Sequence, residues 1–195
     1  MVIQLVWHEE TQFMKTFLVS SGIVALGEMG DKTQLLAVLL AARFRRLLPI
    51  ISGILVATLA NHALASAAVQ WVADTLGSFW LRWIIGVSFI AMAGWMLIPD
   101  RIDDDAAPSQ ALRLGVFGST VVAFFLAEMG DKMQIATVAL AARYDALVAV
   151  VTGTALGMML ANVPAVYFGE AVARRVSIRW VHGVSALIFL LLGVL

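Results

Sequence analysis

A seven-residue string occurs twice in this chain, one hundred residues apart, and both copies lie inside apolar segments. The first copy runs from Glu28 to Gln34 (EMGDKTQ) and the second from Glu128 to Gln134 (EMGDKMQ). Each copy places two acids and one lysine in an apolar segment, where a charge near a bilayer centre costs on the order of 3 kcal/mol. Because the chain bears this cost in a duplicated pattern, we infer that the repeated string handles an ion.

The composition indicates an integral membrane protein. The chain is 62% hydrophobic and only 13% charged, whereas soluble domains have about 25% charged residues. The net charge of zero argues against a nucleic-acid partner. The absence of cysteine excludes disulfides, thiolate metal sites and thiol nucleophiles.

Six segments are long and apolar enough to be transmembrane helices, which need about 20 such residues. They are residues 16–42, 49–73, 81–98, 114–142, 147–172 and 180–195. The first segment lacks a preceding basic region, so we interpret it as a retained span and not as a signal peptide. The predicted fold class is an all-α integral membrane protein with six transmembrane helices.

The duplication extends beyond the seven-residue string. Gly53 matches Gly153, and Ala60-Asn61 matches Ala161-Asn162. We predict a first three-helix repeat at residues 1–98, an acidic linker at 99–113 and a second three-helix repeat at 114–195. Because three spans is an odd number, the second repeat should be inverted in the membrane, an architecture of transporters with the substrate site between the repeats.

Basic residues in the loops predict the orientation of the chain, because cytoplasmic loops carry an excess of them. One side carries Arg43, Arg45, Arg46, Arg101, Arg113, Arg174, Arg175 and Arg179, and the other carries Lys15, Arg82 and Arg143. The richer side, with the acidic run Asp103–Asp105, is expected in the cytoplasm. Both termini are then expected outside the cytoplasm.

The acids of the repeated string suit a hard divalent cation. On a continuous helix Glu28, Asp31 and Lys32 would share one face, because residues three and four apart lie on the same side. Alternatively, Gly30 could let the helix unwind and expose a carbonyl, as in broken transporter helices. A single string of this kind is usually an internally paired polar patch, and the duplication is what favours an ion site.

Brought together, the two copies would carry four carboxylates and two lysines, a net charge of two negative that one divalent cation would neutralise. Their oxygen atoms suit Mn²⁺, Ca²⁺ or Mg²⁺. The predicted cation ligands are Glu28, Asp31, Glu128 and Asp131. Lys32 and Lys132 are expected either to pair with these acids when the site is empty, which we favour, or to act as fixed counter-charges.

Four amide side chains are further candidate ligands: Gln34, Gln134, Asn61 and Asn162. A buried amide in lipid needs partners, so each either joins two helices or offers its oxygen to the ion. His62 has no histidine counterpart, because Val163 takes the matching place. We therefore expect His62 to line the core or a cavity.

With the string E-x-G-D-[KR]-[TS] present twice in six spans, the chain resembles the Gdt family of cation/proton transporters over nearly its full length. The resemblance implies that the four acids form the cation site with both lysines beside them. Thr33 matches the hydroxyl position of the motif as a supporting residue, whereas Met133 does not. The resemblance also implies Mn²⁺ or Ca²⁺ as transported substrate, no cofactor, and, from the bacterial members, manganese export across the inner membrane.

We therefore predict a secondary transporter, and not an enzyme, that exports manganese in exchange for protons by alternating access. The alternatives are a calcium/proton exchanger of the same build, a cation channel, or an intramembrane hydrolase with Asp31 and Asp131 as an acid pair. The hydrolase is disfavoured because the lysine after each aspartate favours its ionised form. The expected partners are a divalent cation, protons and the lipid bilayer, with a homo-oligomer left open and no nucleic acid.

Overall fold

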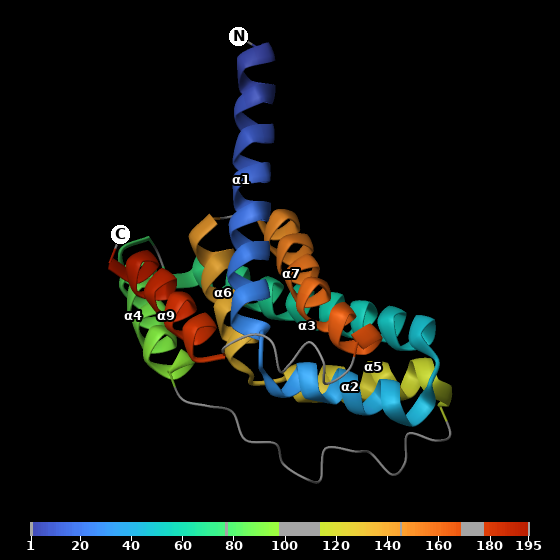
Figure 1. Ribbon diagram of the computed structural model, residues 1–195. Helices are drawn as coiled ribbons and strands as arrows, with labels where there is room; N and C mark the ends of the chain where they lie inside the picture. Colours follow the sequence, from blue (N-terminus) through green and yellow to red (C-terminus); the bar gives the residue numbers. More distant parts are fainter. Residues whose placement is uncertain (1, 77, 98–113, 145, 169–177, 195) are drawn as a thin grey trace.

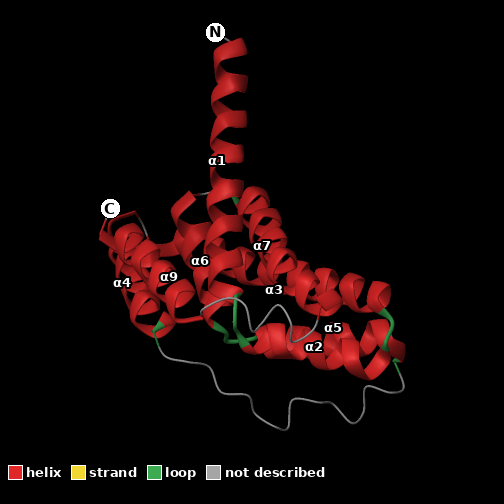
Figure 2. Ribbon diagram, in the orientation of Figure 1, coloured by secondary structure: helices red, strands yellow, loops and turns green. Residues whose placement is uncertain are grey.

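The computed structural model describes residues 2–76, 78–97, 114–144, 146–168 and 178–194, and these residues form helices joined by short turns. In chain order the helices are α1 (Val2–Glu28), α2 (Lys32–Phe44), α3 (Leu47–Leu76), α4 (Ser78–Met96), α5 (Gly115–Glu128), α6 (Lys132–Tyr144), α7 (Leu147–Phe168) and α9 (Ile178–Val194). Figure 1 shows the N-terminal half of α1 rising away from the other helices, and Figure 2 shows helix and turn throughout the described residues. The predicted all-helical class is confirmed.

Each copy of the repeated string interrupts a helix. α1 ends at Glu28 and α2 begins at Lys32, and the same break separates α5 from α6 one hundred residues later. The prediction of continuous helices over residues 16–42 and 114–142 is therefore wrong, and so is the prediction that Glu28 and Lys32 share a face of one helix. The alternative, unwinding at Gly30, is confirmed.

Helices of the first half of the chain pack closely against helices of the second half. α1 packs against α7, and α5 packs against α3; α2 also contacts α7, and α6 also contacts α3. Each of these contacts joins a broken helix of one half to the long third helix of the other half (Figure 1). These contacts occur in matched pairs, so α1, α2 and α3 of the first half pack in a manner equivalent to α5, α6 and α7 of the second half.

Glycines allow the crossing helices to approach closely. A Cβ atom at Gly153 would lie 2.6 Å from the carbonyl oxygen of Phe17, and one at Gly157 would lie 2.6 Å from that of Ser21. At the equivalent crossing, a Cβ atom at Gly53 would lie 2.7 Å from the Cβ of Thr120. Small residues at the contact are typical of helix pairs in membranes, where backbone packing stabilises association. The matched positions of Gly53 and Gly153 are thus matched crossings.

Large apolar side chains cover the outside of the helices, which is the expected surface of a protein solvated by lipid. Leu18, Leu64, Leu126, Leu160 and Leu191 are each more than half exposed. By length and composition, Leu47–Ala68 and Leu147–Phe168 are long and apolar enough to cross a membrane, while Trp83–Trp95 and Gly115–Glu128 are shorter apolar helices. The six-span inverted arrangement stays a prediction.

The linker at 99–113, with the run Asp103–Asp105, lies outside the described residues, as do Arg174 and Arg175. The predicted orientation of the chain therefore stays a prediction as well.

Candidate cation site

The two helix breaks bring acids of both motifs together. Glu28, Asp31 and Asp131 each have a carboxylate oxygen within 4.8 Å of those of the other two. Their exposed fractions are 0%, 2% and 3%. Three ionised carboxylates buried this closely repel one another, so the cluster is stable only when protons or a cation offset their charge.

The geometry of each break follows from the order of residues in the motif. Gly30 has φ 83° and Gly130 has φ 74°, in the left-handed region that favours glycine. The backbone N–H of the next residue then donates to the carbonyl oxygen of the preceding glutamate, at 3.1 Å for Asp31 and 3.0 Å for Asp131. Each aspartate thus lies at the start of the next helix, where the positive end of the helix dipole favours a negative charge.

The glutamine that ends each motif stabilises the turn between the two helices. Oε1 of Gln34 accepts a hydrogen bond from the backbone N–H of Gly30 at 3.0 Å, and Oε1 of Gln134 accepts one from Gly130 at 2.6 Å. A capping box has a similar contact, but there the side chain reaches the backbone N–H of the N-cap residue, whereas here it reaches the glycine before the N-cap aspartate. The spacing of glycine, aspartate and glutamine therefore specifies the turn.

Lys32 joins the two motifs. Its Nζ lies 2.9 Å from Oδ1 of Asp131, and the lysine side chain is 34% exposed whereas the aspartate side chain is 4% exposed. This contact fits both predicted roles of Lys32, because a fixed counter-charge would lie beside the acids as well. The choice between these roles stays a prediction. Lys132 and Thr33 are both buried beside the breaks.

The two glutamates of the motifs have different surroundings. Both carboxylate oxygens of Glu28 are buried without a hydrogen-bond partner among the described residues. Oε1 of Glu128 instead lies 3.0 Å from Nε2 of His62. The compact cluster accordingly contains three of the four predicted carboxylates, and Glu128 lies beside it, close enough to act electrostatically on Glu28.

The side-chain oxygens of three of the four candidate amides accept hydrogen bonds within the protein, those of Gln34, Gln134 and Asn61. Besides the bonds of their oxygens to glycine, Gln34 donates through Nε2 to the carbonyl oxygen of Ala161 at 3.1 Å, and Gln134 donates to Oδ1 of Asn61. Asn162 donates to the carbonyl oxygen of Met158 at 3.1 Å, but its Oδ1 is buried without a partner among the described residues. Of these amides, Asn162 therefore has an oxygen to offer, and it lies beside Glu28.

These contacts correct the predicted register of the repeat. Gln34 reaches residue 161 and Gln134 reaches residue 61, so equivalent positions are one hundred residues apart. Asn61 is therefore equivalent to Ala161, and His62 is equivalent to Asn162. The predicted match of Asn61 with Asn162 is wrong by one residue, because the identity of the side chains suggested it while the packing of the helices sets the register.

His62 is the functional candidate that the sequence reasoning undervalued. It is fully buried, and its Nδ1 lies 2.8 Å from Oγ1 of Thr154 while its Nε2 contacts Glu128. A signal was present in the sequence: a constant offset of one hundred residues, already set by the two motifs, places His62 opposite Asn162. Keeping that offset would have predicted that His62 and Asn162 occupy equivalent positions, but not which residues they contact.

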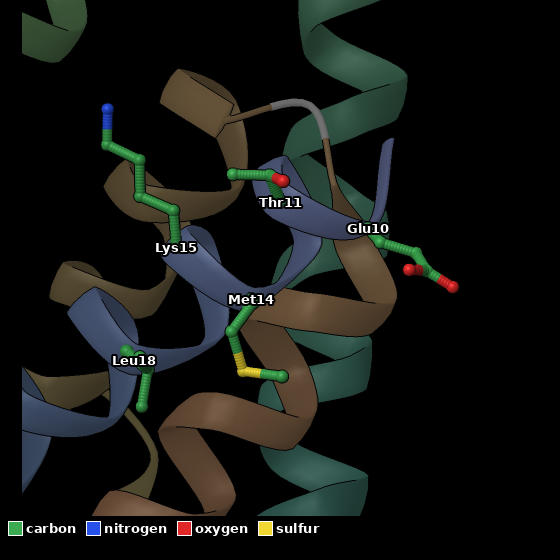
Figure 3. Close-up of a pocket in the computed structure, with 5 residues that line it drawn as sticks. All are labelled: Glu10, Thr11, Met14, Lys15 and Leu18. Atoms are coloured by element: carbon green, nitrogen blue, oxygen red, sulfur yellow. The ribbon is translucent and has the colours of Figure 1, made fainter. Parts of the chain in front are cut away.

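A shallow groove elsewhere on the surface does not belong to this site. It is lined by Glu10, Thr11, Met14, Lys15 and Leu18, all on α1. Figure 3 shows these side chains on successive turns, with Glu10 and Lys15 pointing away from each other. Even the nearest, Leu18, is ten residues before Glu28, about 15 Å along a helix.

Comparison with known proteins agrees with a cation-handling site. The model of a family described as divalent cation/proton antiporter GDT1 matches residues 16–104 and 116–195. A proposed manganese exporter of Vibrio cholerae is 49% identical over 181 residues, covering 92% of this chain and 89% of that protein. The divalent cation/proton antiporter GDT1 of Saccharomyces cerevisiae is 24% identical, covering 93% of this chain and 83% of the yeast protein. A GDT1-like protein of Synechocystis is 28% identical, covering 88% and 91% of the two chains. No solved structure matches this chain.

Proposed function

The chain belongs to the GDT1 family of divalent cation/proton antiporters, and we propose on this premise that it exports Mn²⁺ from the cell in exchange for protons. The observation that carries the proposal is the buried cluster of Glu28, Asp31 and Asp131, with ligand oxygens within 4.8 Å of one another. Carboxylate oxygens are the ligands that Mn²⁺ prefers in proteins. The high identity to a proposed manganese exporter favours the same substrate here.

The cation lies, in this proposal, between two inverted repeats in the bacterial inner membrane. Each repeat contributes three spans, and the first span of each is broken at its motif. The matched contacts of α1 with α7 and of α5 with α3 support a two-fold relation between the repeats. Broken helices that meet at such an interface are a common way for transporters to bind an ion.

The charge of the cluster suits one divalent cation. When ionised, its three carboxylates carry three negative charges, and the ammonium group of Lys32 on Asp131 offsets one of them. A divalent cation would balance the remaining two charges. Both oxygens of Glu28 and Oδ1 of Asn162 lack a hydrogen bond of ordinary geometry among the described residues, so they are the oxygens most available as ligands.

Exchange for protons follows from the same groups. With the cation absent, protons must offset the repulsion among the buried carboxylates, so cation and protons compete for the same oxygens. The near-complete burial of the cluster favours alternating access over a continuously open pore. A cycle in which the cation leaves on one side and protons enter from the other requires no further titratable residue.

The test is the metal content of bacterial cells that lack their own manganese exporter, grown with excess Mn²⁺ with and without this protein. We expect lower total manganese with the intact protein and no effect with Glu28→Gln. Glu10→Gln is the matched control, because the same change is made at an exposed position on the same helix. In proteoliposomes, Mn²⁺ movement should drive an opposite movement of protons.

The two main rivals give distinct results. Unchanged manganese with altered calcium would indicate the calcium/proton exchanger instead. Mn²⁺ flux that is indifferent to an opposing proton gradient would indicate a channel. Full activity in Glu28→Gln would contradict the proposed site.

A further inference from the structure

His62 breaks the symmetry between the two motif glutamates. Its Nε2 lies 3.0 Å from Oε1 of Glu128, and its Nδ1 lies 2.8 Å from Oγ1 of Thr154. The hydroxyl of Thr154 donates to the carbonyl oxygen of Val150 at 2.8 Å, so its lone pair can accept from Nδ1–H. The contact of Nε2 with Oε1 of Glu128 then requires a second proton between these two atoms. The imidazole ring is thus fixed at both nitrogens, and it fixes Glu128 in turn.

The other half of the chain shows what happens without the histidine. Asn162 occupies the position equivalent to His62, and its amide nitrogen donates to Met158 of its own helix. The side chain of Asn162 is within reach of Glu28, the glutamate that it faces, but neither oxygen of Glu28 has a hydrogen bond of ordinary geometry among the described residues. An asparagine at this position leaves its glutamate available to a cation, whereas a histidine holds its glutamate in place.

The number of available carboxylates bears on which cation the site accepts. Ca²⁺ takes six to eight oxygen ligands at about 2.3–2.6 Å and uses bidentate carboxylates, whereas smaller divalent cations require a tighter site with fewer ligands. The compact cluster of Glu28, Asp31 and Asp131 excludes Glu128. Release of Glu128 would add a fourth carboxylate and suit the larger cation.

We propose that His62 is a specificity-determining residue that acts through position: by holding Glu128 outside the cluster, it favours Mn²⁺ over Ca²⁺. This inference rests on the proposed function and adds the basis of its selectivity. Thr154 acts on selectivity indirectly, because it orients the imidazole ring of His62, which in turn positions Glu128. Residues that orient the neighbours of a metal site typically change metal affinity or activity by about 10–100-fold when mutated.

The experiment measures Mn²⁺ transport by the full chain in proteoliposomes, with Ca²⁺ as the competing cation. The readout is the Ca²⁺ concentration that halves Mn²⁺ flux, divided by the KM for Mn²⁺. His62→Asn gives the first half the residue that the second half already has at Asn162, and should lower this ratio by about tenfold or more. Thr154→Val should lower the ratio in the same direction by less.

Thr152→Val is the matched control, because it makes the same change on the same helix at an exposed hydroxyl that bonds to the carbonyl oxygen of Val148. It should leave the ratio unchanged. If His62→Asn does not insert or fold, Thr154→Val decides the question, since it keeps the shape of the side chain. Wild-type selectivity in an active His62→Asn or Thr154→Val protein would overturn this inference alone, whereas absence of Mn²⁺ transport by the wild-type chain would overturn the proposed function.

Discussion

Nζ of Lys32 lies 2.9 Å from Oδ1 of Asp131, so the lysine of the first motif neutralises an acid of the second. The aspartate is almost fully buried and the lysine is about one-third exposed. A cation that binds Oδ1 of Asp131 must move this ammonium group off that oxygen, while the positive charge of Lys32 stays beside the cluster and still offsets one carboxylate. The pair therefore competes with the substrate, in addition to holding the two breaks together.

Replacement of Lys32 by Gln should strengthen cation binding. With the competing positive charge removed, the KM for Mn²⁺ should fall by about fivefold, which corresponds to about 1 kcal/mol, the upper end for a partly exposed ion pair. Initial rates of Mn²⁺ transport over a range of concentrations measure this. Arg43→Gln, an exposed basic residue at the end of α2, is the control and should have wild-type KM. A higher KM in Lys32→Gln would show that the lysine supports the bound state.

Asn162 and Asn61 should differ when each is replaced by Ala. Oδ1 of Asn162 has no hydrogen-bond partner among the described residues and its side chain lies beside Glu28, so its loss should raise the KM for Mn²⁺ by about tenfold, as for a ligand or its close neighbour. Oδ1 of Asn61 accepts from Gln134, so its loss should chiefly lower stability by about 1–3 kcal/mol. Transport kinetics and thermal unfolding of both variants in detergent separate the two effects. Equal changes in KM would contradict the assignment.

The sequence predicted the all-helical class and that acids of the two motifs come together, because the repeated string carries local signals for both. Glycine and aspartate at fixed spacing are local signals of a turn and a helix start, so the break at Gly30 could be foreseen as an alternative. Contacts between distant segments were harder. His62 and Glu128 are 66 residues apart, and no local pattern indicates that they meet.

Sequence divergence between the two repeats explains why the predicted register of the repeat was wrong by one residue. Two asparagines at nearly matching places suggested that Asn61 and Asn162 are equivalent, whereas the packing makes His62 the equivalent of Asn162. Side-chain identity is a weak guide to register when one helix face has changed its chemistry. The asymmetry that we connect to selectivity therefore became visible only when the two glutamates could be compared in space.

The crossing of α1 and α7 should be sensitive to one added methyl group. A Cβ atom at Gly157 would lie 2.6 Å from the carbonyl oxygen of Ser21 and 2.9 Å from the backbone nitrogen of Ala25, and backbone atoms cannot move aside cheaply. Overpacking of this kind costs about 1–3 kcal/mol, so Gly157→Ala should lower the midpoint of thermal unfolding by roughly 5 °C. Gly22→Ala is the control, because a Cβ atom there would have no neighbour within 4 Å. Similar midpoints for the two variants would contradict the close approach.

Met133 occupies the place where the motif has a hydroxyl, and its replacement by Thr tests whether that oxygen matters in the second half. Met133 is 1% exposed and packs in the apolar core with Met158 and Leu140, so restoring the hydroxyl removes core contacts. Loss of a buried side chain of this size costs about 2–4 kcal/mol, and the new hydroxyl would need a partner. We expect Met133→Thr to lower the unfolding midpoint by roughly 5–10 °C and to leave the KM for Mn²⁺ within about twofold of wild type. Met129→Thr makes the same change at a position that is 56% exposed and should preserve the midpoint. A lower KM with unchanged stability in Met133→Thr would instead place residue 133 at the cation, and the second motif would then differ from the first in its ligands and not only in its packing.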